Sequence, residues 1–382
     1  TRLWRVTGVQ TCALPICYTE NDKFSQEDFG AMGIKVSEFG KTSKGKIAHI
    51  YTLVNGKGMA LEVTDYGATM VSILAPDAKG RSKDVLLGYD DVQDYEQGTC
   101  YFGAIIGRNG NRTKDAQVVI DGHVYQMEKN EGENNLHSGS EGYSNIIWDA
   151  SVDEDGNSVS FHHVGADGEQ GLPGTFDITV TYTLTMENEV KIHYEGISDK
   201  DTIANMTNHG YYNLAGHAAG KIEDHILWLD ADAFTPVGQG MIPTGEILPV
   251  EGTPMDFRAA KSIGADIEAD YEQLKIAGGY DHNYVLNNSN GTIRKIAEVT
   301  EPESGRRMEV FSDAVGVQFY AGNFVESIPK GKEGVVYQKR SGLCLETQGF
   351  PDATHHETFP STVLRAGAKY ETTTIYYFSA VK

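Results

Sequence analysis

The feature that most constrains the fold is an alternation of apolar and polar residues, which dominates the chain from about Lys46 onward. Every second residue from Phe176 to Leu184 is apolar, a short polar turn follows at 186–189, and the alternation resumes in 190–194. Because successive side chains of a strand point to opposite faces of a sheet, this pattern predicts a β-hairpin with one buried face.

Similar patterns recur along the chain. The segment 116–127 reads as a second hairpin, with Asp121-Gly122 as a favoured two-residue turn. A third hairpin is expected over 292–313, and a strand near 372–381 closes the chain. Helical patterns are short and confined to 91–96 and 259–269. The sequence therefore predicts an all-β protein with few short helices.

The organisation points to one large antiparallel β domain over residues 18–382, without internal repeats or linkers. Two stacked sheets would bury a common core and let one sheet present a concave polar face. The segment Val6–Ile16 resembles the translation of a sequencing-adapter primer. We therefore expect residues 1–17 to be an artefact that is not part of the fold.

Charge and cysteine content exclude several classes of function. The chain has 54 acidic and 32 basic residues and a net charge of −22, so its own field repels nucleic acids and anionic membranes. It has no apolar run of the ~18 residues that a membrane helix needs. The four cysteines form no C-x-x-C pair, which argues against zinc and a disulfide framework. With no secretory leader, we expect a cytoplasmic protein.

Polar side chains inside otherwise apolar strands mark candidate site residues, because an unpaired buried polar or charged group is costly. Glu346 is the clearest case: it follows a strand-like run, and a period of two places it on the face of Cys344, opposite Leu345. Six segments carry such residues: 105–115 with Asn111 and Arg112, 131–139 with His137, 204–217 with His209, 278–286 with Asp281, 316–323 with Gln318, and 341–356 with Glu346. Taken singly, most could be ordinary turns or surface residues.

The chemistry of these segments favours a sugar site. Tyr211 and Tyr212 lie beside amide and imidazole groups, and sugars bind to flat apolar faces combined with directional hydrogen bonds. The sequence contains no H-E-x-x-H, no acidic calcium loop, no G-x-S-x-G and no P-loop. We therefore expect no metal, no P-loop phosphate site and no serine nucleophile.

The order and wording of the segments resemble the aldose 1-epimerase (galactose mutarotase) family from about Tyr51 to the C-terminus. The matching stretches are FGAIIGRNGNR, NNLHSG, GEQGLPG, TNHGYYNLAGH, IPTGEILPV, DHNY, GVQFYAGN and LCLETQGFPDA. This resemblance implies a β-supersandwich, a large two-layer antiparallel fold with an open sugar cleft. It also implies an enzyme that interconverts the α and β anomers of free hexoses such as galactose and glucose.

The resemblance assigns roles to the candidate residues. Glu346 matches the general base and His209 the general acid, while the expected sugar contacts are His137, Asp281, Arg112, Asn111 and Gln318. Mutarotation needs one base and one acid, and neither metal nor cofactor. We expect the two groups on opposite sides of the sugar ring, with their mutual attraction keeping Glu346 ionised and His209 protonated.

Two alternatives within this fold stay open: an epimerase of a phosphorylated hexose, for which Arg108 and Arg112 would be the candidate phosphate ligands, and a non-catalytic sugar-binding protein. A lyase or hydrolase would need further groups along an extended groove. At four positions the residue differs from the one usual in the family, and we expect these differences to affect which sugar is preferred. The positions are Thr113, Ser138, Tyr212 and His355. We interpret His217 as a structural residue or a residue of the cleft rim, and we expect a monomer or weak dimer acting on a small sugar.

Overall fold

The computed structural model describes residues 32–326 and 329–381. The segment 1–17, expected to be an artefact, lies outside these residues. Strands dominate the described chain, and all named strand pairs are antiparallel. Within this part of the chain, neither α-helix has the length and apolar character that crossing a membrane requires.

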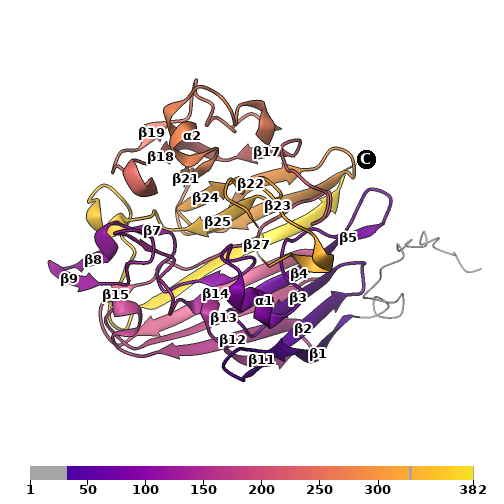
Figure 1. The fold of residues 1–382 in the computed structure, drawn as a ribbon, viewed down its shortest axis with the longest axis horizontal. Helices are drawn as coiled ribbons and strands as arrows, with labels where there is room; N and C mark the ends of the chain where they lie inside the picture. Colours follow the sequence, from indigo (N-terminus) through magenta and orange to yellow (C-terminus); the bar gives the residue numbers. More distant parts are fainter. Residues whose placement is uncertain (1–31, 327–328, 382) are drawn as a thin grey trace, which may run out of the picture.

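The largest element is a nine-stranded sheet, in which the long strand β27 (Lys369–Ala380) occupies the centre (Figure 1). The strands on one side of it are β14 (Glu189–Ser198), β13 (Phe176–Leu184), β12 (Ser158–Gly165) and β11 (Asp149–Asp153). Those on the other side are β23 (Arg306–Ser312), β22 (Arg294–Thr300), β17 (Ile226–Leu229) and β20 (Lys261–Ser262). The predicted hairpins 176–194 and 292–313 are both confirmed as neighbouring strands of this sheet.

Two five-stranded sheets form the other main parts of the fold. The first consists of β1 (Met32–Lys41), β2 (Ile47–Asn55), β3 (Ala60–Thr64), β4 (Thr69–Pro76) and β5 (Ser82–Asp84). The second runs in the order β19 (Leu248–Pro249), β18 (Ala231–Thr235), β21 (Asp281–Leu286), β24 (Gly316–Tyr320) and β25 (Cys344–Gln348). A single hydrophobic core joins both to the nine-stranded sheet, with Leu61 of β3, Val180 of β13 and Phe319 of β24 fully buried in it.

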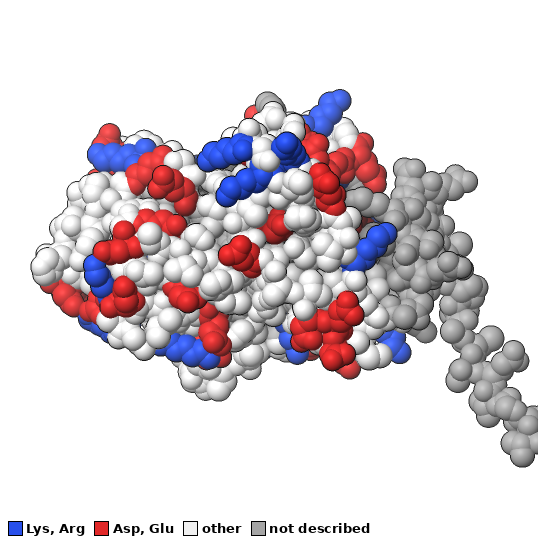
Figure 2. Space-filling model, turned by 90° about the horizontal axis from the view of Figure 1, so that it is seen from below, with Lys and Arg blue, Asp and Glu red and all other residues white. Residues whose placement is uncertain are grey.

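Short elements complete the fold. The two-stranded sheets are β6 (Ile105–Ile106) with β16 (Thr207–Asn208), β7 (Arg112–Thr113) with β10 (Asn135–Leu136), β8 (Gln117–Ile120) with β9 (His123–Gln126), and β15 (Thr202–Ile203) with β26 (Val363–Leu364). The β8–β9 pair confirms the hairpin predicted over 116–127. On the face shown in Figure 2, acidic side chains are widely spread, in keeping with the net charge of −22.

One of the two predicted helices is confirmed. The helix α1 (Val92–Gln97) begins after Asp91, whose side chain accepts hydrogen bonds from the backbone N–H groups of Gln93 and Asp94. The helix expected over 259–269 is wrong, because this segment contains strand β20 and one 3₁₀ turn. Its Ile263 and Ile267 are buried in the core, so the helix-like spacing reflects two separate anchors. The second α-helix, α2 (Glu272–Ala277), follows instead.

The segment 207–213 joins the two five-stranded sheets. Tyr212 forms bridges to Leu86, just after β5, and to Leu343, just before β25. Upstream, His209 accepts a hydrogen bond from Gly103 N–H and donates its own N–H to Ala104 O, both at 2.9 Å. Gly103 has φ +66°, and a Cβ there would lie 1.9 Å from Met70 O, so only glycine fits. The backbone of His209 is therefore fixed within the sheet layer.

Candidate active site

A cavity of about 580 Å³ opens beside the second five-stranded sheet, and we call it the Glu346 cavity. Its size lies in the range of ~300–1,000 Å³ that small-molecule sites occupy. It brings together six of the seven predicted site residues, from distant segments of the chain: Asn111, Arg112, His137, His209, Asp281 and Glu346. The seventh, Gln318, lies behind this wall: it is buried and donates a hydrogen bond of 2.7 Å from Nε2 to Asp281 Oδ1.

The strand register of the second sheet explains how its polar residues reach the cavity. Gln318 of β24 lies directly opposite Glu346 of β25, and Tyr320 lies opposite Cys344. Tyr320 also pairs with Asp281 of β21. Residues opposite one another, and residues two apart, share one face of a sheet. The predicted polar face is therefore present, and Leu345 points into the core on the other side, as expected from the alternation.

His209 and Glu346 form the centre of the cavity. Nε2 of His209 lies 3.8 Å from Oε1 of Glu346, and both side chains are almost completely buried. On the other side of the imidazole ring, Nδ1 lies 3.5 Å from Sγ of Cys344, and Tyr211 stacks on the ring at a centroid distance of 5.0 Å. These contacts fix the ring so that Nε2 faces the carboxylate.

This geometry corrects the expectation that the acid and the base lie on opposite sides of the sugar. A gap of 3.8 Å cannot hold a pyranose ring between the two groups. Both groups instead face the same region, where they can address two neighbouring oxygens of one ligand. The C1 hydroxyl and the ring oxygen of a hexose are such a pair, because both are bonded to C1.

The protonation states expected for the pair are also different in the free site. Burial raises the pKa of Glu346 well above its usual value, and the charge of Asp281 raises it further. Burial lowers the pKa of His209 to about 4. Desolvation thus outweighs the mutual attraction that was expected to keep both groups charged. The free site favours a neutral pair, with one proton on Glu346.

His137 lies next to His209, with the two rings edge to face at a centroid distance of 5.2 Å. The backbone N–H of Asn111 donates a hydrogen bond of 3.1 Å to Nδ1 of His137, so the neutral ring carries its proton on Nε2. Burial, with the nearby His209 and Arg112, lowers the pKa of His137 well below its usual value. His137 is therefore a neutral donor at the cavity wall.

The same trio has some of the features of a metal site. His137, His209 and Glu346 offer ligand atoms that lie within 4.8 Å of one another, and two histidines with one glutamate form a set that binds zinc. A ligating imidazole needs a free lone pair, but Nδ1 of His137 accepts the Asn111 N–H and Nε2 carries the proton. The arrangement suits hydrogen bonding to a ligand better than metal binding.

Arg112 is clamped by two carboxylates at the cavity wall. Its Nε and Nη2 atoms each lie 2.8 Å from an oxygen of Glu131, in a bidentate pair. Its Nη1 atom lies 3.8 Å from Oδ2 of Asp281. Glu131 lines the cavity and was not predicted, because it stands in an irregular turn whose residues follow no period.

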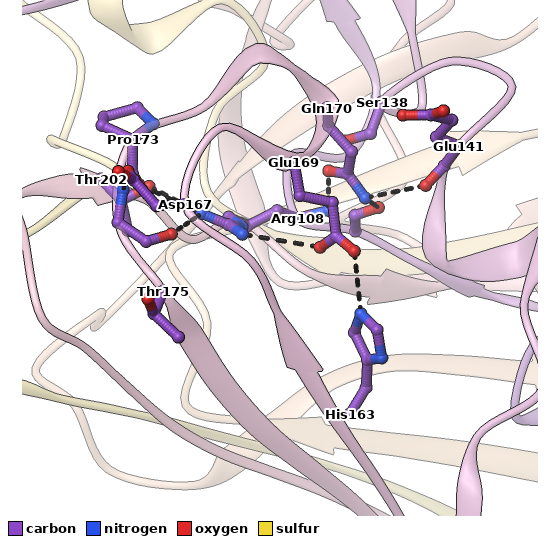
Figure 3. Close-up of polar contacts among 12 residues, drawn as sticks. Arg108, Ser138, Glu141, His163, Asp167, Glu169, Gln170, Pro173, Thr175 and Thr202 are labelled. Atoms are coloured by element: carbon purple, nitrogen blue, oxygen red, sulfur yellow. Dashed lines mark hydrogen bonds and ion pairs between the residues drawn. The ribbon is translucent and has the colours of Figure 1, made fainter.

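A buried polar network behind the cavity holds the loops that carry these residues (Figure 3). Oε1 of Gln170 accepts the N–H of Arg108, and its Nε2 donates to the carbonyls of Gly107 and Glu141. Ser138 bonds both the N–H and the carbonyl of Asn109, each at 2.9 Å. The loops 107–112 and 137–141 are thereby locked together.

Arg108 belongs to this network and not to the cavity. The expectation that Arg108 could bind a phosphate is therefore wrong. Its side chain is fully buried and donates to the carbonyls of Pro173 and Gly174 (Figure 3). Its charge faces Glu169 at 3.6 Å, which in turn contacts His163 at 3.0 Å. No part of the guanidinium is available to a ligand.

Aromatic residues complete the cavity wall, and sequence reasoning found only some of them. Tyr101 contacts both histidine rings, with centroid distances of 4.8 Å to His137 and 5.9 Å to His209. Phe324 also lines the cavity, and 63% of its surface is exposed. No periodicity surrounds either residue. His217 lies outside the lining and forms a 3.0 Å hydrogen bond with Tyr337, in agreement with a structural role.

Known proteins are similar to this chain in both sequence and fold. A sequence model of the aldose 1-epimerase family matches residues 49–377. Galactose mutarotase of Homo sapiens is 39% identical over 321 residues, which cover 84% of this chain and 91% of that protein. Aldose 1-epimerase of Escherichia coli (strain K12) is 35% identical over 339 residues, or 88% of this chain and 96% of that one.

Solved structures agree. An aldose epimerase homologue from C. elegans superposes with a TM-score of 0.79 at 27% identity, covering 92% of this chain and all of that one. Galactose 1-epimerase from Lactobacillus acidophilus gives the same TM-score, identity and coverage. The two-layer β fold expected from the sequence is thereby confirmed.

Proposed function

The chain belongs to the aldose 1-epimerase family, and we propose that it interconverts the α and β anomers of free aldohexoses such as galactose and glucose. The observation that carries the proposal is the buried contact of 3.8 Å between Nε2 of His209 and Oε1 of Glu346. The activities in the names of the relatives support the same reaction.

In the proposed reaction, Glu346 takes the proton of the C1 hydroxyl while Nε2 of His209 gives a proton to the ring oxygen. The C1–O5 bond breaks, and C1 becomes an aldehyde carbon. After rotation about C1–C2, the O5 hydroxyl returns its proton to His209 as it attacks the other face of C1. Glu346 then returns its proton to the former carbonyl oxygen. Each positioned group of this kind typically contributes ~10²–10⁴-fold to the rate.

The burial of the pair fits this cycle. Glu346 and His209 hold one proton between them, and ring opening moves that proton from His209 to Glu346 through the sugar. The opened state therefore contains protonated Glu346 and neutral His209, which is the neutral pair that burial favours. Because opening discharges both groups, a dry site favours the opening step itself, while the same burial makes the preceding ion pair costly to form from the neutral free site.

The remaining cavity residues suit the binding of a neutral sugar. His137 offers a donor, while Asp281 and Asn111 add oxygen acceptors and an amide. The rings of Tyr101 and Phe324 supply flat apolar surface. We propose a monomer or weak dimer as the functional state.

The two alternatives are less well supported. A phosphorylated substrate needs free cations, but Arg108 is buried outside the cavity and Arg112 is already paired with Glu131. A non-catalytic binding protein would not require an acid and a base in contact, and here His209 and Glu346 keep that contact.

The direct test follows the optical rotation of freshly dissolved α-D-galactose and α-D-glucose with and without the protein. We expect the rate of equilibration to rise in proportion to protein concentration, and to return to the buffer rate with heat-inactivated protein. A rate equal to that of buffer for both sugars would overturn the proposal.

A further inference from the structure

The Glu346 cavity is lined by more acidic than basic side chains. Among its described lining residues, Arg112 is the one lysine or arginine, and it shares the cavity with Glu131, Asp281 and Glu346. We propose that Glu131 is a specificity-determining residue: by clamping Arg112 it restricts the cavity to uncharged sugars and excludes phosphorylated hexoses.

The first step of the argument is the geometry of the clamp. Both carboxylate oxygens of Glu131 contact Arg112, at 2.8 Å from Nε and 2.8 Å from Nη2. Such a fork-to-fork pair occupies the edge of the guanidinium that would otherwise bind a phosphate. The opposite side is occupied too, because Nη1 faces Asp281 at 3.8 Å. A phosphate could bind Arg112 only by displacing a carboxylate.

The second step is electrostatic. A phosphate ester carries about −1.5 to −2 charges at neutral pH. Arg112 brings one positive charge, and Glu131 and Asp281 oppose it with two carboxylates, so this part of the cavity has no positive charge to offer. Arg112 is largely buried, with 13% of its side chain exposed, so screening by solvent is weak there. A neutral sugar meets no such barrier, since its hydroxyls can donate to the same carboxylates.

The third step is the position of Glu131. Its side chain is 34% exposed, at the outer part of the cavity, and no contact links it to His209 or Glu346 in the described residues. Glu131 can therefore act on the choice of substrate through Arg112 while the proton transfers occur elsewhere. The inference rests on the proposed function in that it takes a hexose to be the ligand of this cavity.

The experiment compares kcat/KM for α-D-glucose with kcat/KM for glucose 6-phosphate, whose C1 hydroxyl is free. For Glu131→Gln, which keeps the shape and removes the charge, we expect the ratio of glucose to glucose 6-phosphate to fall at least about tenfold. Glu133→Gln is the matched control. Glu133 lies two residues away, is 79% exposed and pairs with Lys129 outside the cavity, so its loss should leave the ratio unchanged.

A double variant shows whether the effect passes through Arg112. Glu131→Gln with Arg112→Gln should lose the phosphate tolerance gained by Glu131→Gln alone, because no freed cation remains. Calorimetric binding of glucose and glucose 6-phosphate gives the same ratio without turnover, so failure of the proposed reaction would not hide the result. A ratio within twofold of wild type for folded Glu131→Gln, or equal tolerance in the double variant, would overturn the proposal.

Discussion

Nε2 of His209 lies 3.8 Å from Oε1 of Glu346, although the two residues are far apart in the sequence. His209 follows β16, which pairs with β6, while Glu346 is the middle residue of β25. The segment 207–213 carries His209 to β25 through the Tyr212–Leu343 bridge. The fold thus places one imidazole and one carboxyl group side by side in a buried cavity, where a single sugar can touch both.

The imidazole should be essential for rate and dispensable for structure. We expect His209→Asn to lower kcat for α-D-galactose by ~10²–10⁴-fold with a small change in KM, because proton donation to the ring oxygen is lost. Polarimetric initial rates over a range of sugar concentrations measure both constants. His217→Asn is the control: this buried histidine lies outside the cavity, and its folded variant should keep the wild-type kcat. Equal kcat values for the two variants would contradict the assignment.

The pH dependence of kcat/KM should show that activity requires one proton on the pair His209 and Glu346. Below about pH 4 both His209 and Glu346 are protonated, so no base remains; above the raised pKa of Glu346 both are deprotonated, so no acid remains. We therefore expect kcat/KM to be bell-shaped, with its acid limb well below 6.5, the ordinary pKa of histidine. An acid limb centred at 6.5 would mean that burial does not govern the pair.

Gln170 should hold the cavity loops in place without touching the ligand. Its side chain makes three hydrogen bonds to backbone groups, two of them buried, and an unsatisfied buried group costs ~1–3 kcal/mol. We expect Gln170→Leu to lower the free energy of unfolding by roughly 2–4 kcal/mol. We also expect a raised KM for galactose, because Asn111 and His137 lose their support. Gln117→Leu, at an exposed glutamine pair, should change neither denaturant stability nor KM.

Stability should depend on pH through buried His225. Its Nε2 accepts the N–H of Leu214, and burial lowers its pKa to about 4, against 6.5 when unfolded. Between these values the unfolded chain binds the proton more tightly. Protonation of His225 therefore does not lower the free energy of unfolding above pH 6.5. As the pH falls from 6.5 toward 4, it lowers the free energy of unfolding by roughly 3 kcal/mol in total. Denaturant midpoints from pH 7 to 4 should fall less steeply for His225→Gln than for wild type; parallel curves would refute this.

Period-two alternation was enough to predict the β class, several of the strands and part of the site. It placed Glu346 and Gln318 inside strands β25 and β24, and Leu345 on the core side. The helix expected over 259–269 was wrong, because the spacing of Ile263 and Ile267 imitates a helix although each residue is a separate core anchor.

Residues in loops could not be placed from a period. Tyr101 has φ 56° and His137 φ 54°, conformations that non-glycine residues adopt only when surrounding contacts impose them. At His137 these contacts come from distant residues, such as Asn111. The clamp between Glu131 and Arg112, and the adjacent positions of the acid and the base, depend on the same long-range packing. Only the folded chain shows them.

The most direct test of the account is the rate at which Glu346→Gln equilibrates fresh α-D-galactose, measured by polarimetry beside wild type. The amide introduced by this substitution keeps the shape of the side chain and cannot accept the C1 proton. We predict a kcat lower by ~10²–10⁴-fold, with galactose still bound by the folded variant in calorimetry. A folded, sugar-binding Glu346→Gln that equilibrates galactose at the wild-type rate would contradict the central claim.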